Sequence, residues 1–517
     1  MFEQLFEEMM DAHNVTMSQL ATRLDIECHV LYRFKDGRGK RSAKLLKDIL
    51  NVVPCDRDTD NKLREALLRE ELEKTCGEDA LECMNELKEL FSVQFLSDDE
   101  MNMEIARKSS HSERKAPIWK ESESLISGRS SVRDAVMAAL NNAREESDGI
   151  PVILWGRGTG TIVFDIACTF HNTEISVEHL YQLKPVTSPK SNLDNLKLLK
   201  EIMPCMRANF NYDVRVAYEE LTSREAFFPF ECLLMTNKAA FWIEKDYKYA
   251  QIITDANILE FYRAKFESQY KNNDAMLQRS VEIAKWQNEI QNTEKCGKVS
   301  YYLNWQLCAM ILIPMDVLEK HIKEDKKEYL LPQLNVFAER LQADKKKKIK
   351  IEYIMLDGVR YFMDTGKILE LPDEWYIPFS REERRKVLKT LLEIVQYEYK
   401  IEKAEWQLTE TENPVNNNST MSLQTENISL ARQIRIINAN HFNLVKGIAL
   451  GSFSEAHSYM SCLGYDGNMI NFMFREAGIT KWLFNFLKFL SESEWVYSTE
   501  EQVKLVEELL REMEEQQ

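Results

Sequence analysis

The stretch from Thr16 to Ser42 constrains the fold of this chain more than any other. It opens with Thr16-Met-Ser-Gln19, a capping box in which the Thr16 hydroxyl and the Gln19 side chain each accept the other's backbone amide. Gly37 and Gly39 then interrupt the chain, and Ser42 is placed to cap a further helix. The sequence therefore predicts four short helices in the first 53 residues: 2–13, a short one after Thr16, 27–35, and one after Ser42.

Apolar residues at helical spacing are expected to pack these four helices around one core. Asp25 stands in the turn between the second and third helices, where a left-handed backbone is needed and Asp tolerates it. The expected inward side chains are Phe2, Leu5, Phe6, Met9, Met10, Leu20, Ala21, Leu24, Ile26, Leu31 and Phe34.

This pattern resembles the Cro/repressor (XRE-like) type of helix-turn-helix domain over roughly residues 1–53. The matching positions are Thr16, Leu20, Ala21, Leu24, Ile26, Leu31, Phe34, Gly37 and Ser42. The chain departs from the family at Met17, Asp25 and Glu27, where Gln, Gly and Ser are usual. The resemblance implies that the third helix enters the major groove of double-stranded DNA, and that a homodimer reads two half-sites.

The charge distribution is compatible with local DNA binding. The whole chain has 67 Lys and Arg against 84 Asp and Glu, a formal net charge of −17. Residues 1–53 hold eight of each sign, so the remainder carries the entire excess. Between Tyr32 and Lys47, seven basic residues face one acid, Asp36, a local charge of 7 − 1 = +6. A contact with a polyanion is therefore expected only there.

Eight residues are the candidate DNA contacts. Cys28, His29, Tyr32 and Arg33 are expected on the outer face of the third helix, with Arg33 placed to read guanine. The phosphate contacts are expected from Lys35, Arg38, Lys40 and Arg41. A solvated basic face on a helical bundle, or a module kept for protein interactions, is the alternative interpretation.

Residues 54–129 are interpreted as a helical, acidic connector and hinge. An apolar stripe could pair with its copy in a second subunit or dock on the next domain, and the sequence leaves both open. The stripe consists of Leu63, Leu67, Leu68, Leu72, Leu81, Met84, Leu87, Leu90 and Phe91. The polar segment 106–117 is expected to be an exposed loop or hinge.

From residue 130 onward, strands and helices alternate, which predicts an α/β (α+β) region in two blocks, 130–272 and 273–517. The fold class is thus multidomain, with an all-α helix-turn-helix domain followed by a larger α/β region. Expected strands are 151–155, 212–218, 231–237, 239–245, 250–255, 304–314, 348–356, 403–409, 432–439 and 445–450. Expected helices are 192–206, 257–270, 317–342 and 381–399, with three more after Phe453, and 410–427 is expected to be a polar loop.

This arrangement resembles large bacterial regulators that join such a helix-turn-helix to an uncharacterised C-terminal region. It is similar, more faintly, to the phospholipase D-like sensor fold of some sugar-responsive regulators. Because one helix-turn-helix makes few base contacts, the region after residue 130 is expected to hold two copies together, with the second block as the candidate, and to sense a small-molecule or peptide ligand.

Signatures of chemistry are few. "WGRGTGT" (155–161) follows a strand and opens a helix, so Arg157, Gly158 and Thr159 are candidate ligand contacts, with a plain tight turn as the alternative. "HIKEDKKE" (321–328) differs from the phospholipase D motif in its last residue and is interpreted as a solvated helix face. The basic run 345–348 is interpreted as a solvated turn.

Ten scattered cysteines favour free thiols in a reducing cytoplasm. We expect no metal, no cofactor, no membrane segment and no enzymatic activity. The leading interpretation is a cytoplasmic DNA-binding transcription regulator, a homodimer with a sensing C-terminal region. The alternatives are a defence or mobile-element effector with a cryptic enzymatic C-terminal region, and an interaction scaffold.

Overall fold

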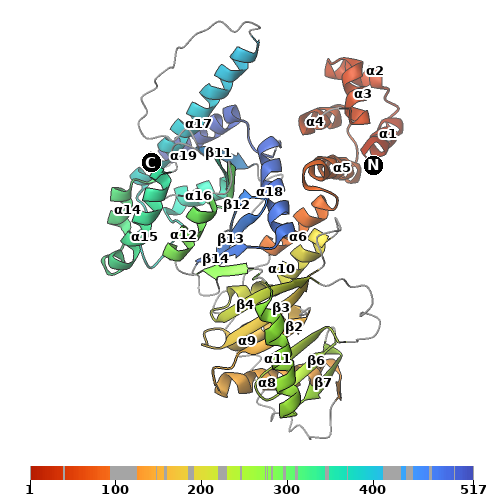
Figure 1. The fold of residues 1–517 in the computed structure, drawn as a ribbon. Coiled ribbons are helices and arrows are strands. Elements are labelled where there is room, and N and C mark those ends of the chain that lie inside the picture. Colours follow the sequence, from red (N-terminus) through yellow and green to blue (C-terminus); the bar gives the residue numbers. More distant parts are fainter. Residues whose placement is uncertain are drawn as a thin grey trace.

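The computed structural model shows a small helical head beside a larger region built on two β-sheets (Figure 1). The structure describes residues 2–515 except 39–40, 93–124, 147, 157–159, 184–190, 219–229, 245–246, 274, 276, 281–282, 295–298, 309–311, 344–348, 370, 411–431, 438–445, 447, 465–468 and 494. The expected hinge 106–117, the polar loop 410–427 (except residue 410, which ends a helix) and the basic run 345–348 thus lie outside the described residues.

The head contains the four expected short helices: α1 (Phe2–Ala12), α2 (Met17–Leu24), α3 (Cys28–Asp36) and α4 (Ala43–Val52). The Thr16–Gln19 capping box is present in both directions, and Ser42 accepts the Leu45 amide at the start of α4. Asp25 adopts the expected left-handed conformation, with φ 54° and ψ 43°. These predictions are confirmed.

One long helix, α5 (Arg57–Cys76), belongs to two hydrophobic cores. Its first half completes the core of the head with Leu63, Ala66 and Leu67. Its second half contributes Leu72 and Cys76 to the core of the larger region. The head core therefore extends past the expected boundary at residue 53.

The next helix, α6 (Ala80–Ser92), packs against α5 and against a helix of the first sheet. Its apolar side chains, including Leu81, Met84, Leu87 and Leu90, lie in the core of the larger region. Within the described residues, the apolar stripe of the connector thus docks on its own chain. The side chain of Phe91 lies outside them.

The first sheet has seven strands in the order β1-β7-β6-β5-β2-β3-β4. β2, β3 and β4 are parallel, and every other neighbouring pair is antiparallel. The strands are β1 (Leu125–Ser127), β2 (Val152–Gly156), β3 (Ser176–Leu183), β4 (Asn211–Tyr218), β5 (Cys232–Met235), β6 (Ala240–Ile243) and β7 (Tyr249–Ile253). Its helices are α8 (Arg129–Glu146), α9 (Gly160–Phe170), α10 (Ser191–Arg207) and α11 (Ala256–Lys271).

The second sheet also has seven strands, in the order β11-β10-β9-β12-β13-β14-β8. The strands are β8 (Leu277–Ser280), β9 (Val299–Asn304), β10 (Ile349–Met355), β11 (Arg432–Ile437), β12 (Ala449–Ser454), β13 (His457–Leu463) and β14 (Met469–Phe474). Its helices are α12 (Ile283–Glu294), α14 (Met315–His321), α15 (Glu324–Ala343), α16 (Leu356–Thr365), α17 (Arg381–Glu410), α18 (Ala477–Glu492) and α19 (Thr499–Glu515).

The two sheets have the same topology. Read from its other end, the second order is β8-β14-β13-β12-β9-β10-β11, so β1 to β7 correspond one by one to β8 to β14. The parallel strands also correspond, because β9, β10 and β11 are parallel like β2, β3 and β4. We call these sheets and their helices the first and second repeats. α11 and α18 are equivalent, since each follows the last strand of its repeat.

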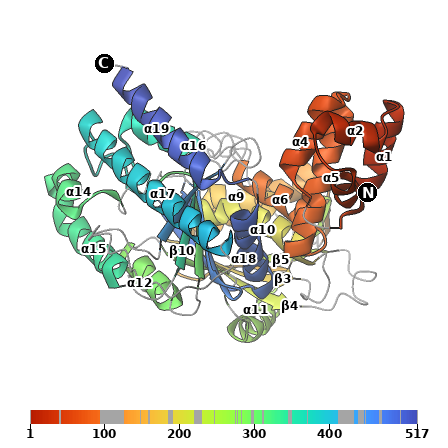
Figure 2. The same cartoon turned by 90° about the horizontal axis from the view of Figure 1, so that it is seen from above.

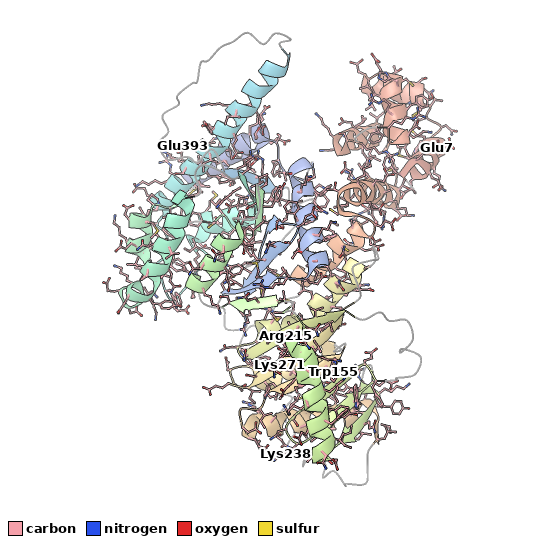
Figure 3. The ribbon with its side chains drawn as sticks, viewed as in Figure 1. Glu7, Trp155, Arg215, Lys238, Lys271 and Glu393 are labelled. Atoms are coloured by element: carbon pink, nitrogen blue, oxygen red, sulfur yellow. The ribbon has the colours of Figure 1, made fainter. Side chains whose placement is uncertain are left out.

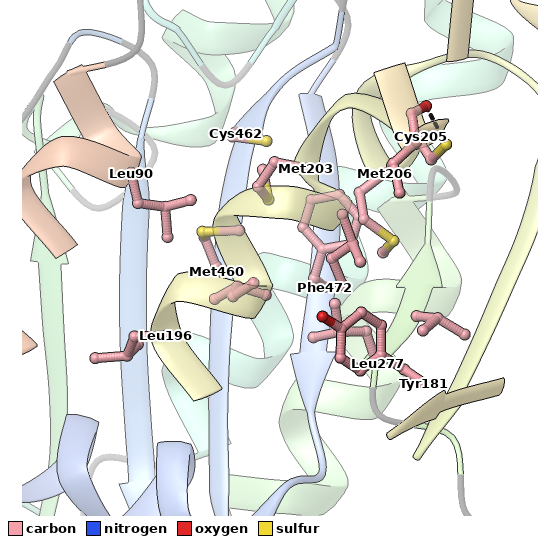
Figure 4. Close-up of a cluster of buried hydrophobic side chains, with 14 of the residues drawn as sticks. Leu90, Tyr181, Leu196, Met203, Cys205, Met206, Leu277, Met460, Cys462 and Phe472 are labelled. Atoms are coloured by element: carbon pink, nitrogen blue, oxygen red, sulfur yellow. Dashed lines mark hydrogen bonds between the residues drawn. The ribbon is translucent and has the colours of Figure 1, made fainter. Parts of the chain in front are cut away.

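A single core joins the repeats. α10 of the first repeat contacts α18 of the second, and β13 and β14 supply side chains to the same cluster (Figure 4). Met203 and Met206 on α10 lie there beside Met460 and Phe472. Seen from above, α18 lies between α10 and the second sheet (Figure 2).

Several expected elements differ in the structure. The strand expected at 304–314 ends at Asn304, and residues 403–409 continue α17 instead of forming a strand. The helix expected over 317–342 is divided into α14 and α15 at Ile322. After Phe453 two helices follow two strands, in place of three helices. No helix in the described part of the chain is long and apolar enough to cross a membrane.

Candidate nucleic-acid interface

The outer face of α3 carries three of the predicted contacts. His29, Tyr32 and Arg33 are exposed, Tyr32 to 49%, whereas Cys28 is half-buried at the edge of the head core. Leu31 and Phe34 on the opposite face anchor the helix in that core. The Arg33 Nε donates to the Arg38 carbonyl oxygen at 3.2 Å, which holds the guanidinium close to the loop that follows α3.

Lys35 does not lie on this exposed face. Its ammonium group pairs with Glu7 at 2.6 Å, Glu3 at 3.4 Å and Asp36 at 3.5 Å, and its side chain is 16% exposed. The hydrogen bond to Glu7 is the main reason that the pKa of Lys35 is raised above its ordinary value. Lys35 therefore pairs with two of the four acids of helix α1, and we remove it from the predicted phosphate contacts.

Arg41 is an interior residue of the head. Only 4% of it is exposed, and its guanidinium lies 4.4 Å from the centre of the Phe2 ring. It donates to the Phe34 carbonyl at 2.6 Å, to the Lys35 carbonyl, and to the Glu70 carboxylate of α5. A side chain with these partners cannot reach a DNA phosphate, so this prediction is also corrected.

Besides Arg33, the exposed cations among the described residues of the stretch 33–47 are Arg38, Lys44 and Lys47. The side chain of Arg38 is 78% exposed and pairs with Asp36 at 3.4 Å. Lys40 lies outside the described residues. Of the four predicted phosphate contacts, Arg38 alone is placed by the structure on the surface.

One acid lies within this surface. Glu27 stands at the N-cap of α3 without a side-chain capping bond, and its carboxylate is 2.8 Å from the His29 Nδ1. The positive end of a helix attracts phosphate, and a carboxylate there opposes it. Glu27 therefore weakens any anion contact at the start of α3.

The "WGRGTGT" turn lies away from the head, between β2 and α9. Arg157, Gly158 and Thr159 lie outside the described residues. Gly156 has φ +117°, and a Cβ there would lie 2.5 Å from the Glu231 carbonyl oxygen, so close packing against the neighbouring strand requires this glycine.

Other charged motifs have structural partners. His321, in the near-miss motif, ends α14 and contacts Glu383 at 3.0 Å and the Ile377 carbonyl at 2.7 Å. Among the residues that the structure describes, no group of three or more His, Cys, Asp or Glu side chains is placed to hold a metal ion.

Comparisons with known proteins give little. No family model matches the chain, and no curated protein matches it. Among solved structures, the chain is similar to TrmBL2, described as an archaeal chromatin protein with a novel mode of DNA binding. The identity is 17% and the TM-score 0.21, over 34% of this chain and 64% of the other, less than two thirds of its length. A likeness this low supports no functional argument.

Proposed function

We propose that this chain is a DNA-binding transcription regulator whose helical head docks α3 in the major groove, in the manner of Cro/repressor-type helix-turn-helix domains. Arg33 reads base edges, with His29 and Tyr32 beside it, while Arg38, Lys44 and Lys47 contact phosphates. The two-repeat region dimerises the chain and senses a ligand in the cytoplasm. In this proposal the protein acts by binding, without catalysis.

One observation carries the proposal: the basic residues around α3 divide into two groups. Lys35 is ion-paired with α1, and Arg41 is buried in the head. Arg33 and Arg38 are exposed, and the Arg33 Nε donates to the Arg38 carbonyl. With Lys35 paired to acids of α1, the exposed cations described in the stretch 33–47 lie on α3, in the loop after it and on α4. Such a one-sided surface fits a polyanion despite a net charge of −17.

The test is fluorescence anisotropy with a labelled duplex of random sequence and with a selected preferred sequence, between 50 and 200 mM salt. Arg33→Ala should lower affinity for the preferred sequence by about 1–3 kcal/mol and reduce its preference over random DNA. Arg38→Ala should weaken both duplexes alike and reduce the salt slope by about one unit.

Two variants complete the design. Glu27→Gln removes the opposing carboxylate and should raise affinity for both duplexes. Lys389→Ala, an exposed cation on α17 of the second repeat, is the matched control and should change nothing. Binding that is absent, or independent of salt, in the unmodified chain would refute the proposal.

A further inference from the structure

Helix α11 presents an uncovered apolar surface. Phe261 is 64% exposed, the highest value for a large apolar side chain among the described residues, and Ile258 is 43% exposed. Phe261 lies 5.8 Å from the ring of Tyr262, which lies 5.9 Å from Trp242 on the sheet. An aromatic row thus continues from the helix onto the first sheet, the face on which Figure 3 shows Trp155 and Lys271.

The equivalent helix of the second repeat is covered. α18 packs on its sheet with one face and contacts α5 and α10 with the other, so Trp482, Phe486 and Leu487 are buried. α11 packs on its sheet in the same way, through Leu259, Phe266 and Tyr270. No described element covers its other side. Among the described elements, α11 thus lacks the covering helices that its counterpart α18 has.

The outer face of α11 carries charges of both signs, so it is complementary to the same face of a second copy. Within the described residues, Glu267 pairs with Lys271, whereas no ion pair is formed by Glu260 or Lys265. Phe261, Ala264 and Ser268 occupy the centre of the exposed face, with Glu260 on one side and Lys265 on the other. An acid five residues before a base, on opposite flanks of a seam centred on Phe261, is the arrangement that pairs across two parallel helices.

We infer that α11 is the dimerisation face, and that its occupant is α11 of a second copy of this chain, packed in parallel. Phe261 of each copy meets Phe261 of the partner subunit, and Glu260 pairs with Lys265 of the partner subunit in both directions. The inference rests on the proposed function, since it supplies the dimer invoked there.

The geometry of the whole chain agrees with a parallel pair. α11 runs along the long direction of Figure 1 and lies at the lower edge of the molecule as drawn in Figure 2. A two-fold axis parallel to α11 keeps both heads at the same end of the dimer. Two copies of α3 can then address one duplex from the same side.

The experiment is analytical ultracentrifugation of the full chain at micromolar concentrations. The unmodified chain should be a dimer, and Phe261→Glu should raise its dissociation constant about tenfold or more. Ile377→Glu, at a 55% exposed isoleucine of the second repeat, is the matched control and should leave the constant unchanged. Circular dichroism verifies that both variants are folded.

Charge reversal tests the parallel arrangement. Glu260→Lys should weaken the dimer, and Glu260→Lys with Lys265→Glu should restore it. A monomeric unmodified chain, or a Phe261→Glu variant that dimerises normally, overturns the inference. A failed rescue overturns the parallel pairing.

A DNA readout separates this inference from the proposed function. Monomeric Phe261→Glu should keep the salt-dependent affinity of each head for random DNA and lose affinity for a two-half-site duplex. If the unmodified chain dimerises but does not bind DNA, the proposed function is refuted and the inference about α11 stands.

Discussion

Arg41 is a structural cation of the head and Arg38 a surface cation, although they stand three residues apart. Both occur in the same basic stretch, where spacing predicts only that several side chains could contact phosphate. The partners that decide the difference are Glu70 on α5 and the carbonyl groups that end α3. Because Glu70 is 29 residues away in the chain, local sequence cannot identify it.

The first prediction compares these two arginines. Arg41→Met should destabilise the head by about 3–5 kcal/mol, because it leaves buried carbonyls and a partly buried carboxylate without their donor. Arg38→Met, at a 78% exposed side chain, should change stability little. Hydrogen exchange of the α3 and α4 amides measures both. Equal protection in the two variants would contradict the interior role of Arg41.

His179 on β3 gives a prediction about pH. Burial lowers its pKa to about 3 from the ordinary 6.5, and the ring lies between the Tyr212 hydroxyl at 2.7 Å and the Gly156 carbonyl at 3.4 Å. Below pH 6.5 the unfolded chain binds a proton that the folded chain does not. Because of His179, the free energy of unfolding is therefore highest above pH 6.5. It falls by about 1.4 kcal/mol for each pH unit between 6.5 and 3.

His179→Gln should remove this dependence, so that between pH 7.5 and 5 its free energy of unfolding falls by about 2 kcal/mol less than that of the unmodified chain. Urea unfolding followed by tryptophan fluorescence measures it. His13→Gln, at an exposed residue of the head, is the control and should behave like the unmodified chain. Identical pH profiles for all three proteins would show that His179 is not the group responsible.

At the scale of elements, α5 is the connection between the head and the repeats. Leu67 and Leu72 are five residues apart on this helix, yet Leu67 belongs to the head core and Leu72 to the core shared by the repeats. The periodicity predicts that both are buried. It could not say that they are buried in different cores, because the partners of Leu72 come from much later in the chain.

Leu67→Ala and Leu72→Ala should therefore act on different parts of the molecule, each by about 2–5 kcal/mol. Leu67→Ala should reduce hydrogen-exchange protection in α1 to α4 and leave the tryptophan-monitored unfolding unchanged, since residues 1–71 contain no tryptophan. Leu72→Ala should lower the tryptophan transition. If each substitution shifted both signals equally, α5 would instead join the two parts into one cooperative unit.

Several helices and strands were predicted correctly where the local sequence contains a capping residue or an apolar run. The caps at Thr16 and Ser42 and the buried strand β2 were predicted because each has its own side-chain or apolar signature. β3 was missed because Glu178, His179 and Gln182 make it look polar, although it lies between two parallel strands. The strand expected at 403–409 was wrong because five of these seven residues (Lys, Ala, Glu, Gln and Leu) favour a helix, and the segment continues a 30-residue helix.

At the scale of the whole molecule, the head should be separable, but not at residue 53. A fragment of residues 1–71 retains Leu63, Leu67 and Glu70, which complete the core and pair with Arg41. We expect it to show a cooperative thermal transition by circular dichroism and to bind random DNA at low salt as strongly per head as the full chain. A 1–53 fragment should remain partly unfolded or have a melting temperature at least ~10 °C lower, since each kcal/mol of lost stability lowers the melting temperature of a small domain by about 4–8 °C.

Weaker random-DNA binding by the 1–71 fragment, after correction for dimerisation, would point to a further DNA contact in the repeats.

The sequence did not predict that the two sheets share one topology. The two repeats correspond strand by strand, but their equivalent helices α11 and α18 differ in burial, so their apolar patterns differ too.

The strand order of the second repeat also sets a schedule for its synthesis. β8 is synthesised first but pairs with β14. Ser280 on β8 can therefore pair with Asn471 only after another 191 residues have been made. At typical translation rates this delay is about 10–40 s. During that time the sheet edge at β14 does not yet exist, and β8 is held near the first repeat by the short link from α11. The first sheet can therefore form on the ribosome before the second sheet can close, and the incomplete second repeat is then the part of the nascent chain that most needs chaperone protection.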